Sequence, residues 1–456
     1  MGEKRPEMGA FVRLNLQNKP FSHLLLLKYG ILLRVFNKKE SNIMAMVLDD
    51  LKGMVAGTCV SGGLDSRTIA KVMMEAGVKV IGFCGGIGQP DEADINDVAK
   101  RMAPTGIETV IVDLRNEMAD ACLEAIKCQA MYDGGYWNST GIGRAVTIKG
   151  LIPEMKKRGV QVLVHGATGR GNDQMRIERY TNVCAPEMKV YAPWRDAGLL
   201  EKFPGRTQMV DYLAQFGIVA FAGGKKKYST DANMAGLSHE AEDLESMETS
   251  MQIVEPTMGV WPWQAPDKFE EVTIRFAKGR VVQINGKDVT PLEAMMLANQ
   301  IGGRNGIGMK HALENRIIGT KSRGVYEAPG MELLGTAIRY VYQATMDRRA
   351  TLFFTQLSKL ITDEIYDGRY YDPTCVAARN AVDTLAQYAD GVVKLSLYKG
   401  NIIFDSLTEC PHTIYNEADS SMEASDGVNP VSSQGFAEIQ SVEARMLALS
   451  GQIEGR

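Results

Sequence analysis

The sequence predicts an α/β protein in which a domain with a parallel sheet is followed by an α+β domain and a C-terminal helix. Two observations support this prediction. From about residue 46 to 218, short apolar runs alternate with amphipathic helical patterns, which is typical of a parallel sheet covered on both faces. Beyond that point, pairs of alternating apolar runs flank Lys-Gly turns, and these pairs indicate antiparallel hairpins.

In the first half of the chain, strands and helices are expected to alternate. The expected strands are 55–60, 78–84, 109–114 and 161–165, and the expected helices are 68–76, 91–102, 117–131, 143–157 and 207–216. Ligands bind beyond the carboxyl ends of the strands in such sheets. Four polar, glycine-containing stretches fall at these ends, namely 61–66, 85–91, 136–144 and 166–176.

In the second half, hairpins are expected at 272–284 and 393–404, with helices at 291–300 and within 331–366. Residues 408–435 are polar and rich in turn formers. They precede one amphipathic run, formed by Phe436, Ile439, Val442, Met446 and Leu449. A lone helix on a polar arm buries nothing of its own, so we expect it to pack on another subunit. The predicted domains are 44–218, 219–407 and an arm with its helix at 408–456.

The two ends of the chain have their own interpretations. Residues 1–43 hold eight Lys or Arg against three Glu. They are either a basic targeting leader or an upstream extension ahead of a start near Met44 or Met46. We favour the extension, because the segment lacks a small-residue cleavage pattern. The final residues, 453–456, read Ile-Glu-Gly-Arg and match a common protease-tag site. One interpretation is that they derive from such a tag.

Composition excludes several classes of protein. Net charge is −4, from 51 basic and 55 acidic side chains, so there is no general attraction to nucleic acid or to an anionic membrane. No apolar run reaches the roughly 18 residues of a membrane span. The seven cysteines form no Cys-x-x-Cys pair, which favours reduced thiols in a cytoplasmic protein. A zinc site built by the protein is disfavoured, because the five histidines are scattered.

The turn after the first expected strand carries the clearest chemistry. Residues 59–67 read Cys-Val-Ser-Gly-Gly-Leu-Asp-Ser-Arg. Glycines before a helix N-terminus leave backbone N–H groups free for a phosphate, although a tight turn without a ligand would use the same residues. Walker A and Gly-x-Gly-x-x-Gly patterns are absent. The stretch resembles the pyrophosphate loop of N-type ATP pyrophosphatases, which implies an adenine nucleotide alpha hydrolase-like domain that splits ATP between its α and β phosphates.

Further stretches resemble the argininosuccinate synthase family, in the same order from about residue 52 onward. They are 88–91, 166–176, 192–195, 203–206, 227–233, 238–240, 314–316 and 321–327. This resemblance implies that ATP, L-citrulline and L-aspartate give argininosuccinate, AMP and diphosphate through citrullyl-AMP, in arginine biosynthesis. It also implies a cytoplasmic homotetramer, with Mg²⁺ carried by ATP and Asp65 rather than by a dedicated protein site.

The resemblance assigns roles to individual residues of this chain. Asp65 and Asp173 would be catalytic. ATP would contact Cys59, Val60, Ser61, Gly62, Gly63, Leu64, Asp65, Ser66, Arg67, Gly85, Gly166, Thr168, Asp173 and Asp231. Citrulline would contact Tyr136, Asn172, Arg176, Ser229, Ser238, Glu240, Glu314 and Tyr326, and aspartate would contact Thr140, Thr168, Asn172 and Asp173.

Structural roles are alternatives for some of these residues. Asp173 and Asp231 could cap helices, Tyr136 could be packing, and Arg176 and Glu314 could form surface ion pairs. Two other functions also compete with the one above. One is a relative that adenylates a different ureido or acid substrate, and the other is a non-catalytic protein that acts through an oligomer interface. The resemblance leaves the role of the bulky Arg67 unexplained.

Overall fold

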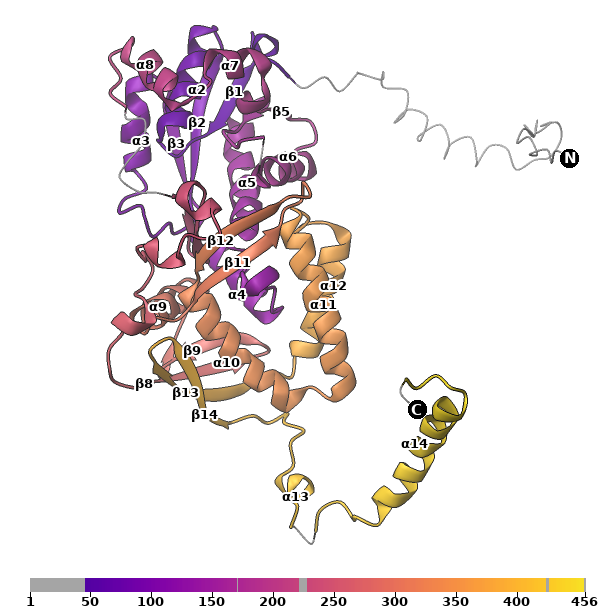
Figure 1. The fold of residues 1–456 in the computed structure, drawn as a ribbon. Helices are drawn as coiled ribbons and strands as arrows, with labels where there is room; N and C mark the ends of the chain where they lie inside the picture. The colour runs from indigo at the N-terminus through magenta and orange to yellow at the C-terminus, as the bar shows by residue number, and fades with distance from the viewer. Residues whose placement is uncertain (1–45, 170, 221–227, 424–425, 455–456) are drawn as a thin grey trace, which may run out of the picture. The chain divides into compact units, whose positions relative to one another are not determined.

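A computed structural model describes residues 46–169, 171–220, 228–423 and 426–454 of the chain (Figure 1). Residues 1–43, interpreted from the sequence as a targeting leader or an upstream extension, lie outside the described residues. Among the helices of the described ranges, none combines the length and the apolar character needed to cross a bilayer.

The first half forms a fully parallel sheet of five strands in the order β3-β2-β1-β4-β5. Its strands are β1 Val55–Cys59, β2 Lys79–Gly86, β3 Glu108–Asp113, β4 Val162–Val164 and β5 Lys189–Tyr191. All residues of β2 after Lys79 are buried, as expected for a strand covered on both faces. The strand order reverses between β1 and β4, so the loops that follow these strands diverge and leave a crevice. The predicted parallel α/β architecture is confirmed.

The helices of this half are α2 Leu64–Glu75, α3 Asp97–Met102, α4 Arg115–Lys127, α5 Ser139–Lys157, α6 Asp173–Cys184, α7 Ala197–Lys202 and α8 Arg206–Ala214. The predicted helix at 91–102 is wrong in its first half. Asp94 Oδ1 accepts hydrogen bonds from the backbone and side-chain nitrogens of Asn96, and this local turn competes with a helix. The helix predicted at 68–76 begins four residues earlier, so Asp65 lies in its first turn.

Two antiparallel sheets make up the second half. One has the order β10-β9-β8-β13-β14, and its strands are β8 Glu270–Ala277, β9 Arg280–Ile284, β10 Lys287–Asp288, β13 Gly391–Tyr398 and β14 Asn401–Thr408. It confirms both predicted hairpins. Lys278, Gly279, Lys399 and Gly400 all have positive φ, the conformation that two-residue hairpin turns require.

The other sheet has the order β11-β12-β7-β6 and was not predicted. Its strands are β6 Ser229–Asn233, β7 Gly236–Glu240, β11 Met309–Asn315 and β12 Lys321–Glu327. The first two strands are short and rich in polar residues, so they lack the apolar alternation that marks a strand in sequence. Both pack against α5, and Met234 between them donates a backbone hydrogen bond to the Ile87 carbonyl of the first half.

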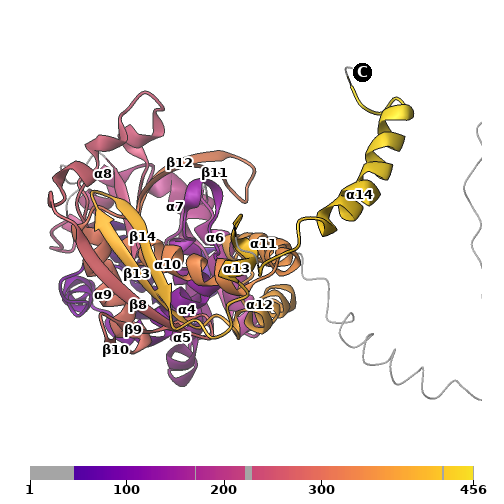
Figure 2. The same ribbon diagram turned by 90° about the horizontal axis from the view of Figure 1, so that it is seen from below.

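The helices of the second half are α9 Pro291–Arg304, α10 Pro329–Thr345, α11 Arg348–Tyr366 and α12 Pro373–Ala386. The helical stretch predicted within 331–366 is therefore two helices. The break comes at Asp347, whose Oδ1 caps α11 by accepting hydrogen bonds from the backbone nitrogens of Arg349 and Ala350. α10 packs against β8, β13 and β14 (Figure 2).

One apolar core connects the helices of the parallel sheet to the second half, running from Ile81 to Leu397. α4 packs against α5 and also against α9, α10 and β9 of the second half. The two halves therefore bury their apolar side chains in one common core. This packing brings the four-stranded sheet to the carboxyl ends of the parallel strands.

The C-terminal arm carries α13 Glu417–Ser420 and α14 Ser432–Leu449. α14 contains the predicted amphipathic run, so the predicted helix is confirmed. Its five apolar positions, from Phe436 to Leu449, are between 55% and 75% exposed. Packing of this face on another subunit stays a prediction.

Candidate active site

The turn between β1 and α2 has the geometry of an anion-binding loop. Gly62 has φ +75°, and a Cβ at this position would lie 2.6 Å from Arg101 Nε, so only glycine fits. Gly63 is the N-cap of α2 and no side chain caps the helix, which leaves its first-turn N–H groups for a ligand. Ser66 Oγ accepts a hydrogen bond from Ser61 N at 3.1 Å and closes the turn.

Three arginines from three different helices surround this loop. Arg101 Nη2 donates to Ser61 O at 3.1 Å, and Arg206 Nη1 lies 4.0 Å from Asp65 Oδ2. Burial raises the pKa of Asp65, and Arg206 opposes that shift. Arg67, which the sequence left unexplained, donates from Nη1 to Val219 O at 2.9 Å and so ties α2 to the end of the first half. We call residues 59–67 the phosphate loop. The arginines around it concentrate positive charge where a triphosphate would sit.

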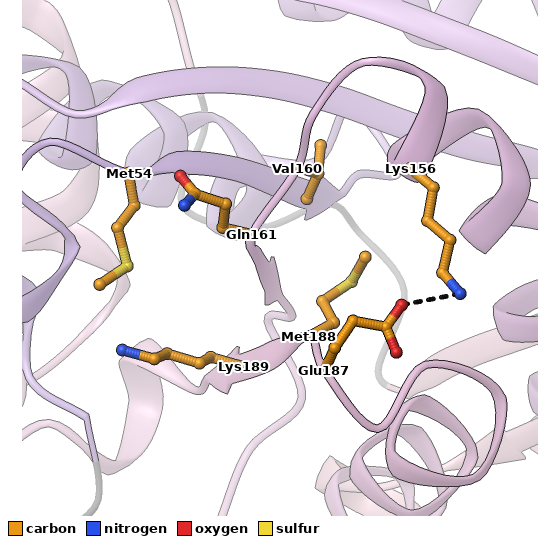
Figure 3. A pocket seen from close by; sticks show the side chains of 7 residues that line it. All are labelled: Met54, Lys156, Val160, Gln161, Glu187, Met188 and Lys189. Atoms are coloured by element: carbon orange, nitrogen blue, oxygen red, sulfur yellow. Dashed lines mark ion pairs between the residues drawn. The ribbon is translucent and has the colours of Figure 1, made fainter.

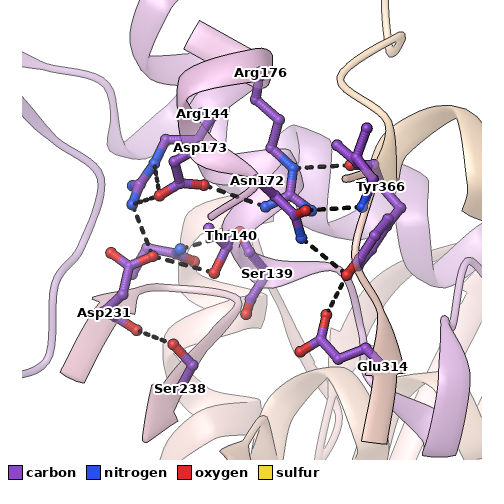
Figure 4. A network of polar contacts seen from close by, with 12 residues as sticks. Ser139, Thr140, Arg144, Asn172, Asp173, Arg176, Asp231, Ser238, Glu314 and Tyr366 are labelled. Carbon is purple, nitrogen blue, oxygen red and sulfur yellow. Dashed lines mark hydrogen bonds and ion pairs between the residues drawn. The ribbon is translucent and has the colours of Figure 1, made fainter. Parts of the chain in front are cut away.

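A second cluster centres on Arg144, which was not among the predicted site residues. Arg144 Nη2 donates to Asp173 Oδ2 at 2.7 Å and to Asp231 Oδ2 at 2.9 Å (Figure 4). Thr140 Oγ1 also donates to Asp231 Oδ2, at 3.1 Å. Burial alone would lower the pKa of Arg144, but the two carboxylates raise it above its usual value. Because Arg144 follows Thr140 by four residues on one helix, its spacing could have placed it on the same face.

The alternative that Asp173 and Asp231 cap helices is wrong for both residues. Asp231 lies within β6 and caps no helix. Asp173 is the first residue of α6, behind the N-cap Asn172, and its carboxylate binds arginines instead of backbone nitrogens. Burial opposes ionisation of Asp173, but Arg144 and then Arg176 lower its pKa below the usual value. Asp173 is therefore held as a carboxylate.

A third cluster surrounds Arg176. Its Nη1 donates to Asp173 Oδ1 at 3.2 Å and its Nε donates to the Tyr366 carbonyl at 2.8 Å. Arg176 is 3% exposed and Glu314 is 6% exposed, so the surface ion pairs considered for them are excluded. Arg176 Nη2 is buried and has no hydrogen-bond partner among the described residues. An unsatisfied guanidinium N–H inside a protein is costly, which makes it a candidate contact for an anionic ligand.

Aromatic residues frame this cluster. The rings of Tyr136 and Tyr326 stack with centroids 4.2 Å apart. Tyr136 is buried, and its hydroxyl accepts a hydrogen bond from Thr140 N at 2.9 Å. Tyr366 lies beside Asn172 and Glu314 and was not predicted (Figure 4).

One cavity of about 740 Å³ joins the three clusters. Most of the predicted site residues line it: Cys59, Val60, Ser61, Asp65, Ser66, Gly85, Tyr136, Thr140, Gly166, Thr168, Asn172, Asp173, Arg176, Ser229, Asp231, Ser238, Glu240, Glu314 and Tyr326. The cavity lining does not include Gly62, Gly63, Leu64 or Arg67. It does include Arg144, Arg206 and Arg316, which were not predicted.

The carboxylates at the far end of the cavity have shifted pKa values. Burial, and then the charges of Asp173, Glu314 and Asp231, raise the pKa of Glu240 to about 7, while Arg316 lowers it. Burial also raises the pKa of Glu314.

Burial raises the pKa of the Cys59 thiol to about 12, so this cysteine is no nucleophile near neutral pH.

A smaller pocket of about 240 Å³ lies at the opposite edge of the parallel sheet (Figure 3). Its lining residues are Met54, Lys156, Val160, Gln161, Glu187, Met188 and Lys189. Lys156 Nζ pairs with Glu187 Oε1 at 2.8 Å. Because strands β1, β4 and β5 begin here, the pocket is at their amino ends, and it contains none of the predicted site residues.

The metal-binding capacity of the described residues is limited. They contain no group of three or more His, Cys, Asp or Glu side chains that could hold a metal ion. Residues 59–67 of the phosphate loop contain a single acidic side chain. Asp65 is the carboxylate of that loop, and its side chain is 43% exposed.

Comparison with known proteins gives matches in both halves. Residues 57–219 match the family model described as "Arginosuccinate synthase N-terminal HUP domain". Residues 228–447 match the model described as "Arginosuccinate synthase C-terminal domain". Among solved structures, a predicted subunit of tRNA methyltransferase from Methanocaldococcus jannaschii is similar at 12% identity, over 38% of this chain and 94% of that one. Its TM-score of 0.24 is too low to support an argument.

Proposed function

The chain belongs to the argininosuccinate synthase family, and we propose that the 740 Å³ cavity is the site where it joins citrulline to aspartate. Members of this family are ATP-dependent ligases of arginine biosynthesis. The ureido oxygen of L-citrulline attacks the α phosphate of ATP, which gives citrullyl-AMP and releases diphosphate. The amine of L-aspartate then displaces AMP and gives argininosuccinate. Both steps build charge on phosphate oxygens, so the site needs fixed donors and alignment of the reactants.

The phosphate loop is the proposed binding site for the ATP phosphates. Residues 59–67 and the N-terminus of α2 offer backbone N–H groups, and Gly62 leaves room for close approach. Arg101 and Arg206 lie beside the loop and could neutralise the leaving diphosphate. Gly85 at the end of β2 and Gly166 after β4, on either side of β1, would line the adenosine. Mg²⁺ belongs to this proposal, carried by the phosphates with Asp65 as its protein ligand, where it would neutralise negative charge.

The far end of the cavity is the proposed citrulline site, and the orphaned Nη2 of Arg176 is the observation that carries it. A substrate carboxylate there would satisfy this buried N–H group. The carboxylates of Glu314 and Glu240 line the same end and could accept the substrate's ammonium group. Tyr136, Ser229, Ser238 and Tyr326 would supply the remaining contacts.

Aspartate is proposed to bind between these two ends. Thr140, Thr168, Asn172 and Asp173 line the cavity there and combine a carboxylate with an amide and hydroxyl groups. Such a set can bind an ammonium and a carboxylate at once. Asp173 is held ionised by Arg144 and Arg176, which suits it to receive aspartate's ammonium.

Two further parts of the proposal concern assembly and location. We propose a homotetramer in which the exposed apolar face of α14 packs on another subunit. A cytoplasmic location and the domain limits 44–218, 219–407 and 408–456 also stay predictions.

The decisive experiment is a diphosphate-release assay with ATP and single amino acids. Sustained release should require both L-citrulline and L-aspartate. Equal release with glutamine in place of citrulline, or with glutamate in place of aspartate, would contradict the proposed substrates. Asp173→Ala should lose activity, because it removes a carboxylate held at the centre of the cavity.

A further inference from the structure

Tyr366, the last residue of α11, lies behind the proposed citrulline site. It is 1% exposed and is not part of the cavity lining. Its hydroxyl accepts a hydrogen bond from Asn172 Nδ2 at 2.9 Å and donates one to Glu314 Oε2 at 2.6 Å (Figure 4). Its carbonyl accepts from Arg176 Nε at 2.8 Å, and its ring centroid lies 4.8 Å from Arg176 Cζ. One buried residue therefore contacts three of the residues assigned to citrulline.

We propose that Tyr366 is a positioning residue that sets the enzyme's affinity for citrulline by holding Asn172, Arg176 and Glu314 in one arrangement. This inference rests on the proposed function, because it takes those three residues as citrulline contacts. The side chains come from α6, its N-cap and β11, and Tyr366 comes from α11, so no local sequence contact aligns them.

The hydroxyl of Tyr366 fixes the orientation of the Asn172 amide. Asn172 Oδ1 accepts a hydrogen bond from Ile317 N at 2.9 Å, while its Nδ2 donates to Tyr366. Because one partner is a donor and the other an acceptor, a flipped amide would lose both bonds. One Nδ2–H is thus left for a ligand.

The same hydroxyl opposes the effect of burial on the pKa of Glu314. Burial raises the pKa of Glu314, whereas the hydrogen bond from Tyr366, and then Arg176 and Arg316, lower it, and Asp133 raises it. Burial and the neighbouring Glu314 raise the pKa of Tyr366 above its usual range, so the hydroxyl keeps its proton and remains a donor. Loss of this donor would raise the pKa of Glu314 further.

The Tyr132 ring holds the Tyr366 side chain in place. The Tyr132 ring stacks on it with centroids 3.7 Å apart, and Tyr132 itself donates to Asn315 O at 3.0 Å. The Tyr366 ring would therefore keep its position when only its hydroxyl is removed. Tyr366→Phe also keeps the carbonyl and the ring that contact Arg176, so it tests the hydroxyl alone.

Tyr366→Phe should raise the KM for citrulline by about ten- to a hundredfold, the loss expected for a hydrogen bond to a charged group. The KM for ATP should stay within about twofold, because the phosphate loop is untouched. The acid limb of kcat/KM for citrulline should move to higher pH. Tyr342→Phe is the matched control, since its buried hydroxyl donates to Lys127 O at 2.8 Å and Tyr342 does not line the cavity.

Calorimetric measurement of citrulline binding to the wild-type protein distinguishes a failure of the inference on Tyr366 from a failure of the proposed function. If the wild type binds citrulline and Tyr366→Phe binds it equally well with an unchanged pH profile, the inference is overturned and the proposed function stands. If Tyr342→Phe weakens citrulline binding as much as Tyr366→Phe, the effect is general and the inference is also overturned. If the wild type neither binds citrulline nor requires it for diphosphate release, the proposed function fails and the inference fails with it.

Discussion

The ionisation of Glu240 should make citrulline use pH-dependent near neutrality. Glu240 lies on β7 and lines the cavity. Burial, and then the charges of Asp173, Glu314 and Asp231, raise its pKa from 4.5 to about 7. A carboxylic acid with this pKa changes charge in the range where the enzyme can be assayed. Glu240→Gln removes that charge while keeping the size of the side chain.

The expected magnitude follows from the pKa. With a value of about 7, roughly a tenth of the protein carries ionised Glu240 at pH 6 and roughly nine tenths at pH 8. The ratio kcat/KM reports the free enzyme, so an ionised Glu240 that receives the substrate's ammonium predicts about a tenfold rise between those pH values. In Glu240→Gln the rise should become smaller, because the amide does not titrate, and the part that remains belongs to Glu314, whose pKa is also raised.

The free energy of unfolding should fall as the pH rises, whereas kcat/KM for citrulline should increase. The pKa of Glu240 is higher in the folded state than its ordinary value, so its proton stabilises the folded protein. This contribution is complete below about pH 4.5 and is lost as the pH rises to about 7, by up to about 3 kcal/mol in the free energy of unfolding. Glu314 shifts in the same direction, so the comparison of wild type with Glu240→Gln isolates the contribution of Glu240.

The assay is diphosphate release at varied citrulline between about pH 6 and about pH 8, combined with urea unfolding at about pH 4 and about pH 8, which spans the range in which the proton of Glu240 is lost. Asp405→Asn is the control, because it also removes one carboxylate but lies on β14, bonded to Ser396. That variant should keep the wild-type profile. If Glu240→Gln retains the tenfold rise, another group titrates and the reasoning about Glu240 is refuted.

Three other expectations concern the rest of the site and the arm. Arg144→Ala should lower the free energy of unfolding by about 1–3 kcal/mol, because it removes charge-assisted hydrogen bonds to the partly buried carboxylates of Asp173 and Asp231. A double-mutant cycle with Asp231→Asn in urea should show coupling, and additive losses would contradict the bridge. Gly62→Ala should cost about 1–3 kcal/mol and raise the KM for ATP, because its φ is +75° and its Cβ meets Arg101; unchanged ATP kinetics would count against the loop. Truncation before α14 should reduce the oligomer in sedimentation, and an intact tetramer would exclude the helix as its interface.

Local chemistry determined several features of this protein without tertiary information. The phosphate loop could be recognised because Gly62 and Gly63 come directly between an apolar strand and a helix, and all the required groups lie within nine residues. Both long hairpins could be recognised for the same reason, since Lys278-Gly279 and Lys399-Gly400 set the positive φ values of their turns. The parallel sheet could be predicted because short apolar runs alternate with helical patterns, and both signals are local in the sequence.

The polar contacts inside the cavity depended on the tertiary structure. Arg144 bridges carboxylates 29 and 87 residues away, and Tyr366 reaches Asn172 across 194 residues. In sequence, each of these side chains is equally compatible with a solvated surface, because a polar residue acquires a fixed partner only when burial removes water as the alternative. α5 creates that burial by packing against α6, β6 and α11. The sequence by itself thus determined the loop that would hold ATP. Packing alone decided which charges face one another in the cavity, since their interaction depends on distance in space and not along the chain.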